Sequence, residues 1–187
     1  MKVIFLDVDG ILTYINSGKQ NGGIDETRVE RLKEIVNETG AKIVIISSWK
    51  GYYLKNGTYY KPKIYDVLES VLKKHDLLIY DNTIYIDLKY RKELPLGASY
   101  SLEELNNISL EEYLDPTTTR AAEVYNWLKK HPKVDSFVIL DDEDHLWSYY
   151  GYDKYWIQPS WYQEDGGLQL EHIKEAIEIL NRKREEL

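Results

Sequence analysis

Three short runs built entirely of apolar residues constrain the fold of this chain more than any other feature. They cover residues 3–6, 43–46 and 137–140 and contain only Val, Ile, Phe and Leu. Because no polar residue alternates with the apolar ones, strands formed by these runs would be buried on both faces, as in a parallel sheet flanked by helices. The runs therefore predict the centre of such a sheet.

Helical patterns lie between and after these runs. Asp25 precedes one of them and Gly40 follows it, so we expect Asp25 to cap a helix that ends at Gly40. The threonines at 117–119 offer a cap for a second helix that begins near Arg120, and a third helix follows the glycines at 166–167. The apolar stripes of the three helices are Val29, Leu32, Ile35 and Val36; Ala121, Val124, Tyr125 and Leu128; and Leu170, Ile173, Ile177 and Leu180.

Weaker strand signals complete the pattern. A segment around residues 155–157 predicts another strand, and residues 77–80 and 84–88 flank Asp81-Asn82-Thr83 as the two strands of a hairpin. The alternation of strands and helices predicts a three-layer α/β fold with a mainly parallel sheet. A chain of 187 residues can bury a real core, so we expect residues 1–187 to form a single domain.

Composition excludes several classes of protein. The chain has no cysteine, which excludes disulfide scaffolds, zinc-thiolate sites and thiol nucleophiles. Its net charge of −8 disfavours broad attraction to duplex nucleic acid, although a local basic patch could still bind a phosphorylated substrate. No apolar stretch is long enough to span a bilayer, and the first residues do not resemble a cleavable leader. We therefore expect a cytoplasmic protein with no membrane partner.

Polar side chains follow each of the three apolar runs, where the strands would end. Asp7 and Asp9 follow the first run, Ser47 follows the second, and Asp141 and Asp142 follow the third. If the strands are parallel, these residues meet at one edge of the sheet, where α/β folds bind their ligands. Carboxylates that meet at this edge repel one another unless a cation lies between them, and an all-oxygen ligand set suits Mg²⁺.

Donors for an anion are expected at the same edge. The hydroxyl group of Ser47 with the neighbouring backbone N–H groups, and Arg120 near a helix N-terminus, could bind a phosphate group. Carboxylates, a hard cation and phosphate donors together indicate phosphoryl transfer. Taken alone, Asp7-Val8-Asp9-Gly10 would fit an exposed polar turn equally well.

Four motifs in this order resemble the haloacid dehalogenase superfamily: Asp7-Val8-Asp9-Gly10, Ser47, the basic residue Arg120, and Leu140-Asp141-Asp142. A narrower resemblance, to the haloacid-dehalogenase-like (HAD-like) domain of Swiss Army Knife RNA repair proteins, rests on longer stretches. These are residues 5–12, Ser47-Ser48-Trp49-Lys50, Arg120 with Val124 and Trp127-Leu128, residues 138–142, and Gly167-Leu168. The resemblance spans nearly the whole chain. It implies a three-layer α/β/α Rossmannoid fold with a small or absent cap.

The resemblance also implies a role for each motif residue. Asp7 would be the nucleophile that forms an aspartyl-phosphate, and Asp9 would be the general acid and base. The ligands of Mg²⁺ would be Asp7, the backbone carbonyl of Asp9 and Asp141, with Asp142 either as a further ligand or as a residue that holds a metal-bound water. The phosphate-binding residues would be Ser47, Ser48 and Arg120. Most relatives carry Lys where Arg120 stands. The narrower branch usually carries Arg where Lys50 stands, which puts a phosphate-binding role for Lys50 in doubt.

Several of these residues have a purely structural alternative. The sole role of Ser47 could be to cap a following helix. Arg120 could pair with Glu123 or Glu143 at the surface. Asp142 and Glu143 could be solvated residues at the start of a helix, where acidic groups are favoured.

Two aromatic segments and one histidine leave further alternatives. Residues 51–115 could add a small lid, and the tyrosines and lysines between residues 52 and 65 could stack bases and contact a phosphate backbone. These tyrosines could instead face a half-buried sheet or helix. We expect His145 to have a structural role or to lie at the rim of the site. A second aromatic group could also line the rim or mediate association: Trp147, Tyr149, Tyr150, Tyr152, Tyr155, Trp156, Trp161 and Tyr162.

The motifs and the resemblance together predict a Mg²⁺-dependent phosphomonoesterase. The favoured substrate is a nucleotide or the phosphorylated end of RNA or DNA, an expectation that comes from the resemblance to RNA repair proteins. A phosphatase for small metabolites such as sugar phosphates is a second hypothesis. A non-catalytic phosphate-binding module with the same fold is a third, and the presence of both Asp7 and Asp9 argues against it. The sequence identifies no protein partner.

Overall fold

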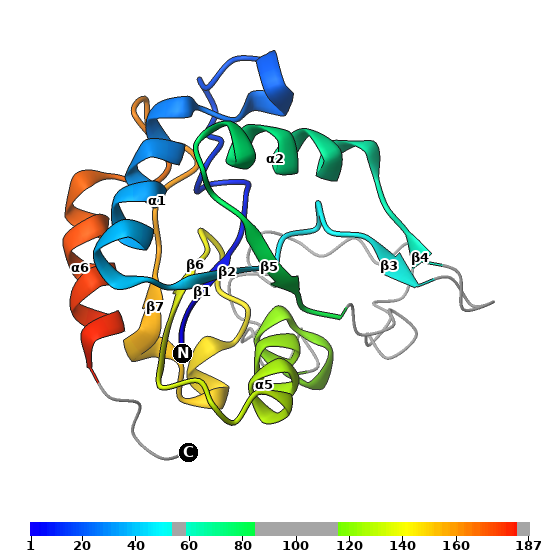
Figure 1. Ribbon diagram of the computed structural model, residues 1–187, viewed down its shortest axis with the longest axis vertical. Helices are drawn as coiled ribbons and strands as arrows, with labels where there is room; N and C mark the ends of the chain where they lie inside the picture. Colours follow the sequence, from blue (N-terminus) through cyan, green and yellow to red (C-terminus); the bar gives the residue numbers. More distant parts are fainter. Residues whose placement is uncertain (54–58, 85–115, 183–187) are drawn as a thin grey trace, which may run out of the picture.

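A five-stranded parallel sheet forms the centre of the molecule (Figure 1). The structure is a computed structural model that describes residues 1–53, 59–84 and 116–182. The strand order is β5-β2-β1-β6-β7, and every neighbouring pair is parallel. The strands are β1 (Lys2–Leu6), β2 (Lys42–Ile45), β5 (Ile79–Asn82), β6 (Ser136–Leu140) and β7 (Trp156–Ile157). This sheet, with helices packed against it, confirms the predicted α/β fold with a mainly parallel sheet.

The three apolar runs form the middle of this sheet, as predicted. All residues of 3–6, 43–46 and 137–140 have side chains with at most 1% of their surface exposed. Full burial of a large apolar side chain stabilises the fold by about 1.5–3 kcal/mol relative to leaving that side chain in water. Because both faces of these strands are buried, the three runs dominate the core. β1 lies between β2 and β6, with Leu6 opposite Ile45 on one side and Leu140 on the other.

Four helices among the described residues cover the sheet. They are α1 (Glu26–Thr39), α2 (Lys63–Lys74), α5 (Arg120–Lys130) and α6 (Leu170–Asn181). In Figure 1, α1 and α6 lie side by side on one side of the sheet and α5 lies on the other. Short 3-10 helices occur in the loops: η1 (Gln20–Gly23), η3 (Pro116–Thr118), η4 (Trp147–Tyr150) and η5 (Asp153–Tyr155).

The predicted helix caps are confirmed. The Asp25 side chain accepts hydrogen bonds from the backbone N–H groups of Thr27 and Arg28 at the start of α1. Gly40 ends that helix in the left-handed conformation. Among the three threonines that could cap α5, Thr119 does so, because its hydroxyl oxygen accepts a hydrogen bond from the N–H of Ala122.

The third strand region differs from its prediction. Asp81 and Asn82 were expected in the turn of a hairpin, but they belong to β5, which pairs in parallel with β2 at the edge of the sheet. An edge strand tolerates polar residues because one of its sides lacks a neighbouring strand. The second expected strand, residues 84–88, lies almost wholly outside the described residues. In α6, Leu170 was expected in the buried stripe but is 65% exposed, at the first position of the helix.

Part of the stretch predicted as a lid belongs to the main fold. Within residues 51–115, α2 and β5 join the central layers, and β3 (Tyr52–Tyr53) and β4 (Tyr59–Tyr60) form a separate antiparallel pair. Residues 54–58 and 85–115 lie outside the described residues, so a single domain with a lid in this stretch stays a prediction. In the described part of the chain, none of the helices has the length and apolar character needed to cross a membrane.

Candidate active site

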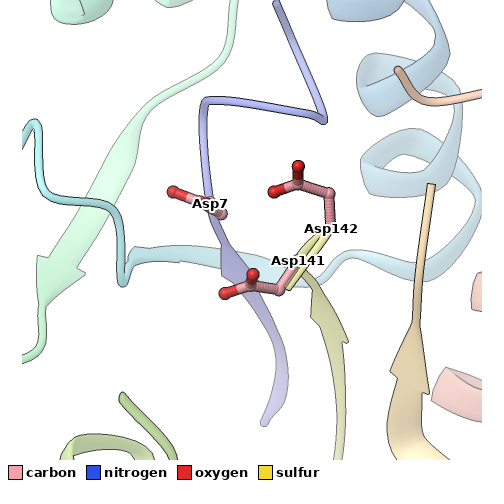
Figure 2. Close-up of side chains that lie close together, drawn as sticks. All are labelled: Asp7, Asp141 and Asp142. Atoms are coloured by element: carbon pink, nitrogen blue, oxygen red, sulfur yellow. The ribbon is translucent and has the colours of Figure 1, made fainter. Parts of the chain in front are cut away.

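The strand register brings the two acidic motifs together. Asp7 follows β1 and Asp141 follows β6, and the backbone N–H of Asp7 donates to the carbonyl of Leu140 at 2.9 Å. Figure 2 shows the side chains of Asp7, Asp141 and Asp142 gathered at the ends of these two strands. One carboxylate oxygen from each of the three lies within 4.8 Å of the others. The sequence prediction that separate acidic motifs converge is therefore correct for these residues.

Burial makes this cluster electrostatically costly without a cation. Asp141 is fully buried and Asp7 is 4% exposed. Burial and the charge of Asp7 raise the pKa of Asp142 to about 6. Burial also raises the pKa of Asp141 above its usual range, although Arg120 opposes this effect. Three crowded carboxylate oxygens with no nitrogen or sulfur ligand fit a hard divalent cation such as Mg²⁺.

Arg120 lies between the two buried aspartates. One terminal nitrogen of its guanidinium donates to Oδ2 of Asp7 at 2.8 Å and to Oδ2 of Asp141 at 2.7 Å. Burial disfavours the charged form, but these carboxylates raise the pKa of Arg120 above its usual value, so it remains a cation. The alternative that Arg120 pairs at the surface with Glu123 is wrong, because Glu123 is buried and pairs with Lys50.

Asp9 is held at the mouth of the site by two side chains. Its Oδ2 accepts a hydrogen bond from the indole N–H of Trp49 at 2.8 Å, and its Oδ1 accepts one from the hydroxyl group of Thr13 at 3.1 Å. Asp9 is partly exposed and lines the same pocket as Asp7. The sequence analysis missed both Trp49 and Thr13 as partners of Asp9, because neither is at a spacing that a local pattern would reveal.

The two serines after β2 have different environments. Ser47 is fully buried, and its hydroxyl oxygen accepts a hydrogen bond from the backbone N–H of Trp49 within a turn. The described residues 48–53 directly after Ser47 form a turn and the strand β3 and no helix, so its alternative role as a helix cap is wrong. Ser48 is exposed and lines the pocket, whereas Ser47 does not line it.

Lys50 lies behind the site. Its side chain is 1% exposed, and its ammonium group donates to the carbonyl of Ile46 at 2.8 Å and to Glu123 Oε2 at 2.9 Å. The hydroxyl group of Thr83 donates to the same oxygen of Glu123 at 2.7 Å. Glu123 is one turn after Arg120 on α5, so Lys50 ties this helix to the end of β2 and does not face the pocket.

The segment after β6 differs from the alternative in which Asp142 and Glu143 are solvated residues at the start of a helix. No helix starts at Asp142 or Glu143, so neither residue is at a helix start, and Asp142 is partly buried. Glu143 is exposed and lines the pocket. His145 Nε2 lies 3.6 Å from Asp141 Oδ1, which places His145 beside the acidic cluster and outside the pocket lining, in agreement with a supporting role.

A pocket of about 880 Å³ opens over these residues. Its lining consists of motif residues and of a loop after β7: Asp7, Asp9, Ser48, Arg120, Asp142, Glu143, Gln158, Pro159, Ser160, Trp161 and Tyr162. The loop has no motif of its own, and only its aromatic content marked it in the sequence. Volumes of about 300–1,000 Å³ are usual for sites that bind small organic ligands.

The two aromatic segments behave differently. In the second segment, Trp147, Tyr152 and Tyr155 belong to the core, whereas Trp161 and Tyr162 line the pocket as one alternative predicted. In the first segment, Tyr60 is 48% exposed and does not line the pocket. The side chains of residues 52–59 lie outside the described residues, so base stacking there stays a prediction.

Comparisons with known proteins agree with this geometry. The profile of one protein family, described as the HAD domain in Swiss Army Knife RNA repair proteins, matches residues 3–173. No curated protein and no solved structure matches the chain significantly. The matched region includes every strand of the central sheet apart from the first residue of β1, together with all three residues of the acidic cluster.

Proposed function

Since the chain belongs to the family of HAD domains found in Swiss Army Knife RNA repair proteins, we propose that it is a Mg²⁺-dependent phosphomonoesterase that forms an aspartyl-phosphate on Asp7. Family membership suggests a phosphohydrolase of the haloacid dehalogenase type in general terms. The observation that carries the finer proposal is the cluster of Asp7, Asp141 and Asp142, in which Asp7 and Asp142 line the pocket and Asp141 is fully buried next to them. Arg120 lies beside this cluster.

The acidic cluster is the proposed metal site. Asp7, Asp141 and Asp142 would hold Mg²⁺, with the backbone carbonyl of Asp9 as a further ligand. A bound Mg²⁺ would neutralise charge on the phosphate oxygens and so lower the barrier to attack by an anionic carboxylate. Arg120 already compensates part of the negative charge of Asp7 and Asp141, and a guanidinium can also donate to phosphate oxygens.

The chemical steps are assigned to Asp7 and Asp9. A carboxylate oxygen of Asp7 attacks phosphorus, and the bond between phosphorus and the ester oxygen breaks. Asp9, held by Trp49 and Thr13, gives its proton to the leaving oxygen. Asp9 then accepts a proton from a water molecule that attacks the aspartyl-phosphate, which releases inorganic phosphate and restores the Asp7 carboxylate. The exposed hydroxyl group of Ser48 at the pocket wall is a further donor for the phosphate.

The proposed substrate is a nucleotide or a phosphorylated nucleic-acid end. The support for this class is the family description, which refers to RNA repair proteins. The pocket volume of about 880 Å³ leaves room for more than a phosphate group. A phosphate monoester would bind with its phosphate group beside the acidic cluster and the rest of the substrate in the open part of the pocket.

Phosphate release by purified protein tests this function. We expect release from a generic aryl phosphate, from mononucleotides and from oligonucleotides with a 5′- or 3′-phosphate, in Mg²⁺ and not in EDTA. Asp7→Asn removes the nucleophile and should lower the rate by at least about a thousandfold, as for other covalent catalysts. Asp153→Asn, which changes an exposed carboxylate away from the pocket, is the matched control. Full activity of Asp7→Asn would exclude the covalent mechanism.

A further inference from the structure

Two aromatic side chains lie in the same pocket as the acidic cluster and have no assigned role. Trp161 and Tyr162 both line the pocket, and Tyr162 is 82% exposed. Among the described residues, neither ring has an aromatic, cation–π or side-chain hydrogen-bond partner. Trp161 is half-buried. Exposing a large ring to water is unfavourable, so an exposed ring next to a half-buried one at a pocket wall indicates a surface for a ligand.

The backbone that carries these rings is held in place. The N–H of Ile15 donates to the carbonyl of Trp161 at 3.1 Å, and the N–H of Gly167 donates to the carbonyl of Ser160 at 2.9 Å. Arg28, which is 3% exposed, donates from Nε to the carbonyl of Gly166 at 2.8 Å and pairs with Asp165. A wall that is ordered before the ligand binds loses little conformational entropy on binding.

The charge of the pocket argues against a second phosphate site near this wall. Its described lining includes four acidic residues, and Arg120 is its one cation, already shared by Asp7 and Asp141. A polyphosphate or a long anionic strand would gain few favourable contacts from such a lining. The wall instead offers flat aromatic faces, which bind planar rings by stacking.

We propose that Trp161 and Tyr162 form a stacking wall for the nucleobase of the nucleotide whose phosphate lies over Asp7. This inference rests on the proposed function and narrows its substrate to phosphates that carry a nucleobase close by. The bound unit is one nucleotide, either free or at the end of a strand.

Two ligands that differ only in the base provide the test: adenosine 5′-monophosphate and ribose 5-phosphate. Their dissociation constants are measured by calorimetry with Mg²⁺ on the Asp7→Asn background, where turnover is blocked. Replacing Trp161 or Tyr162 by Ala should lower the preference for adenosine 5′-monophosphate over ribose 5-phosphate by about tenfold, the scale of one base–aromatic stack. Tyr162→Phe keeps the aromatic ring and should keep the preference for adenosine 5′-monophosphate.

Tyr149→Ala is the matched control, because Tyr149 is 57% exposed and does not line the pocket. It should leave the preference unchanged. A preference that is equally unchanged in Trp161→Ala and Tyr162→Ala would overturn the stacking wall. Equal affinity of the Asp7→Asn protein for the two ligands would also overturn it and would favour a sugar phosphate as substrate.

The same design separates this inference from the proposed function. If the protein with Asp7 intact releases no phosphate from either ligand, but the binding preference falls in the two alanine variants, the phosphatase function fails and the stacking wall stands. A trinucleotide with a 5′-phosphate distinguishes the two sources of the nucleotide. If the trinucleotide binds as tightly as adenosine 5′-monophosphate and its binding depends on Tyr162, the stacking wall is supported and the substrate is a strand end. If the trinucleotide does not bind, but binding of the mononucleotide still depends on Tyr162, the stacking wall is supported and the substrate is a free nucleotide.

Discussion

Gly10 and Asp142 are in such close contact that only glycine fits at position 10. A Cβ atom added to Gly10 would lie 2.1 Å from Cγ of Asp142, and the backbone there has φ of +72°. The glycine thus allows the loop after β1 to pass directly beside a proposed metal ligand.

Gly10→Ala should displace the Asp142 carboxylate and weaken Mg²⁺ binding by at least about tenfold, besides a backbone cost of about 1–2 kcal/mol for the left-handed conformation. Calorimetric titration with Mg²⁺ and thermal unfolding measure the two effects. Gly18→Ala is the matched control, because Gly18 has φ of +82° but no atom within 4 Å of an added Cβ. Equal Mg²⁺ affinity in the two variants would show that Asp142 does not need this close approach.

The buried pair of Lys50 and Glu123 makes a prediction about stability. Burial lowers the pKa of Lys50 below its usual value, although Glu123 opposes this effect. Lys50→Met would leave the Glu123 carboxylate buried without its cation, and should lower the free energy of unfolding by about 3–5 kcal/mol. Denaturant unfolding measures this change.

Two further variants test the physical reason. The double variant Lys50→Met with Glu123→Met should recover much of the lost stability, because no buried charge remains unpaired. Lys74→Met breaks an exposed pair with Glu26 and should have a far smaller effect than Lys50→Met. If Lys50→Met unfolds at the same denaturant concentration as the unchanged protein, Lys50 does not have the structural role assigned to it.

At the scale of single elements, the first turn of α1 depends on Asp25. Burial alone would raise the pKa of Asp25, but hydrogen bonds from the N–H groups of Thr27 and Arg28 and the charge of Arg28 lower it below its usual value. The ionised form is therefore the one that stabilises the fold. This contribution is present above the ordinary aspartate pKa of about 4 and is lost as the pH falls through the lower folded value.

Asp25→Ala should lower the free energy of unfolding by about 1 kcal/mol at pH 7, and the difference from the unchanged protein should shrink below about pH 4. Urea unfolding at a series of pH values gives both numbers. A deficit that grows as the pH is lowered would have the wrong sign for a cap that acts through its carboxylate.

The elements that the sequence predicts best are those whose burial is visible in local composition. The runs at 3–6, 43–46 and 137–140 lack polar residues because both faces of these strands are covered, so their position needs no tertiary information. Helix α2 was not predicted, although Leu68, Val71 and Leu72 have helical spacing and are buried, because the tyrosines and lysines nearby suggested a binding surface instead. β5 was misread because its polar residues Asp81 and Asn82 are also typical of turns.

The site was predictable where motifs end strands, and not where the partners come from elsewhere in the chain. Asp7 and Asp141 converge because β1 and β6 are parallel neighbours, a consequence of fold class. The contact of Asp9 with Trp49 and the pairing of Lys50 with Glu123 depend on how loops and α5 pack. The loop that carries the pocket wall at residues 158–162 is held at residues 165–166 by Arg28 of α1, more than a hundred positions earlier, so no local spacing indicates it.

At the scale of the whole molecule, the acidic cluster couples segments that are far apart in the sequence. Asp7 follows β1, and Asp141 and Asp142 follow β6, so a cation held by all three would link the two strand ends only in the folded state. Mg²⁺ at a hundred times its dissociation constant should therefore raise the free energy of unfolding by about 2.7 kcal/mol. Denaturant unfolding in Mg²⁺ and in EDTA measures this difference. Asp142→Asn should reduce it, and an undiminished Mg²⁺ effect in that variant would mean that the cation binds elsewhere.

The location of a divalent cation in crystals tests the central claim most directly. Mn²⁺ prefers the same oxygen ligands as Mg²⁺ and gives an anomalous signal. In crystals grown with Mn²⁺, we predict one strong anomalous peak within coordination distance of carboxylate oxygens of Asp7, Asp141 and Asp142. Crystals with saturating Mn²⁺ and no peak among these three residues, or with a peak only at other carboxylates, would contradict the assignment of this cluster as a metal site.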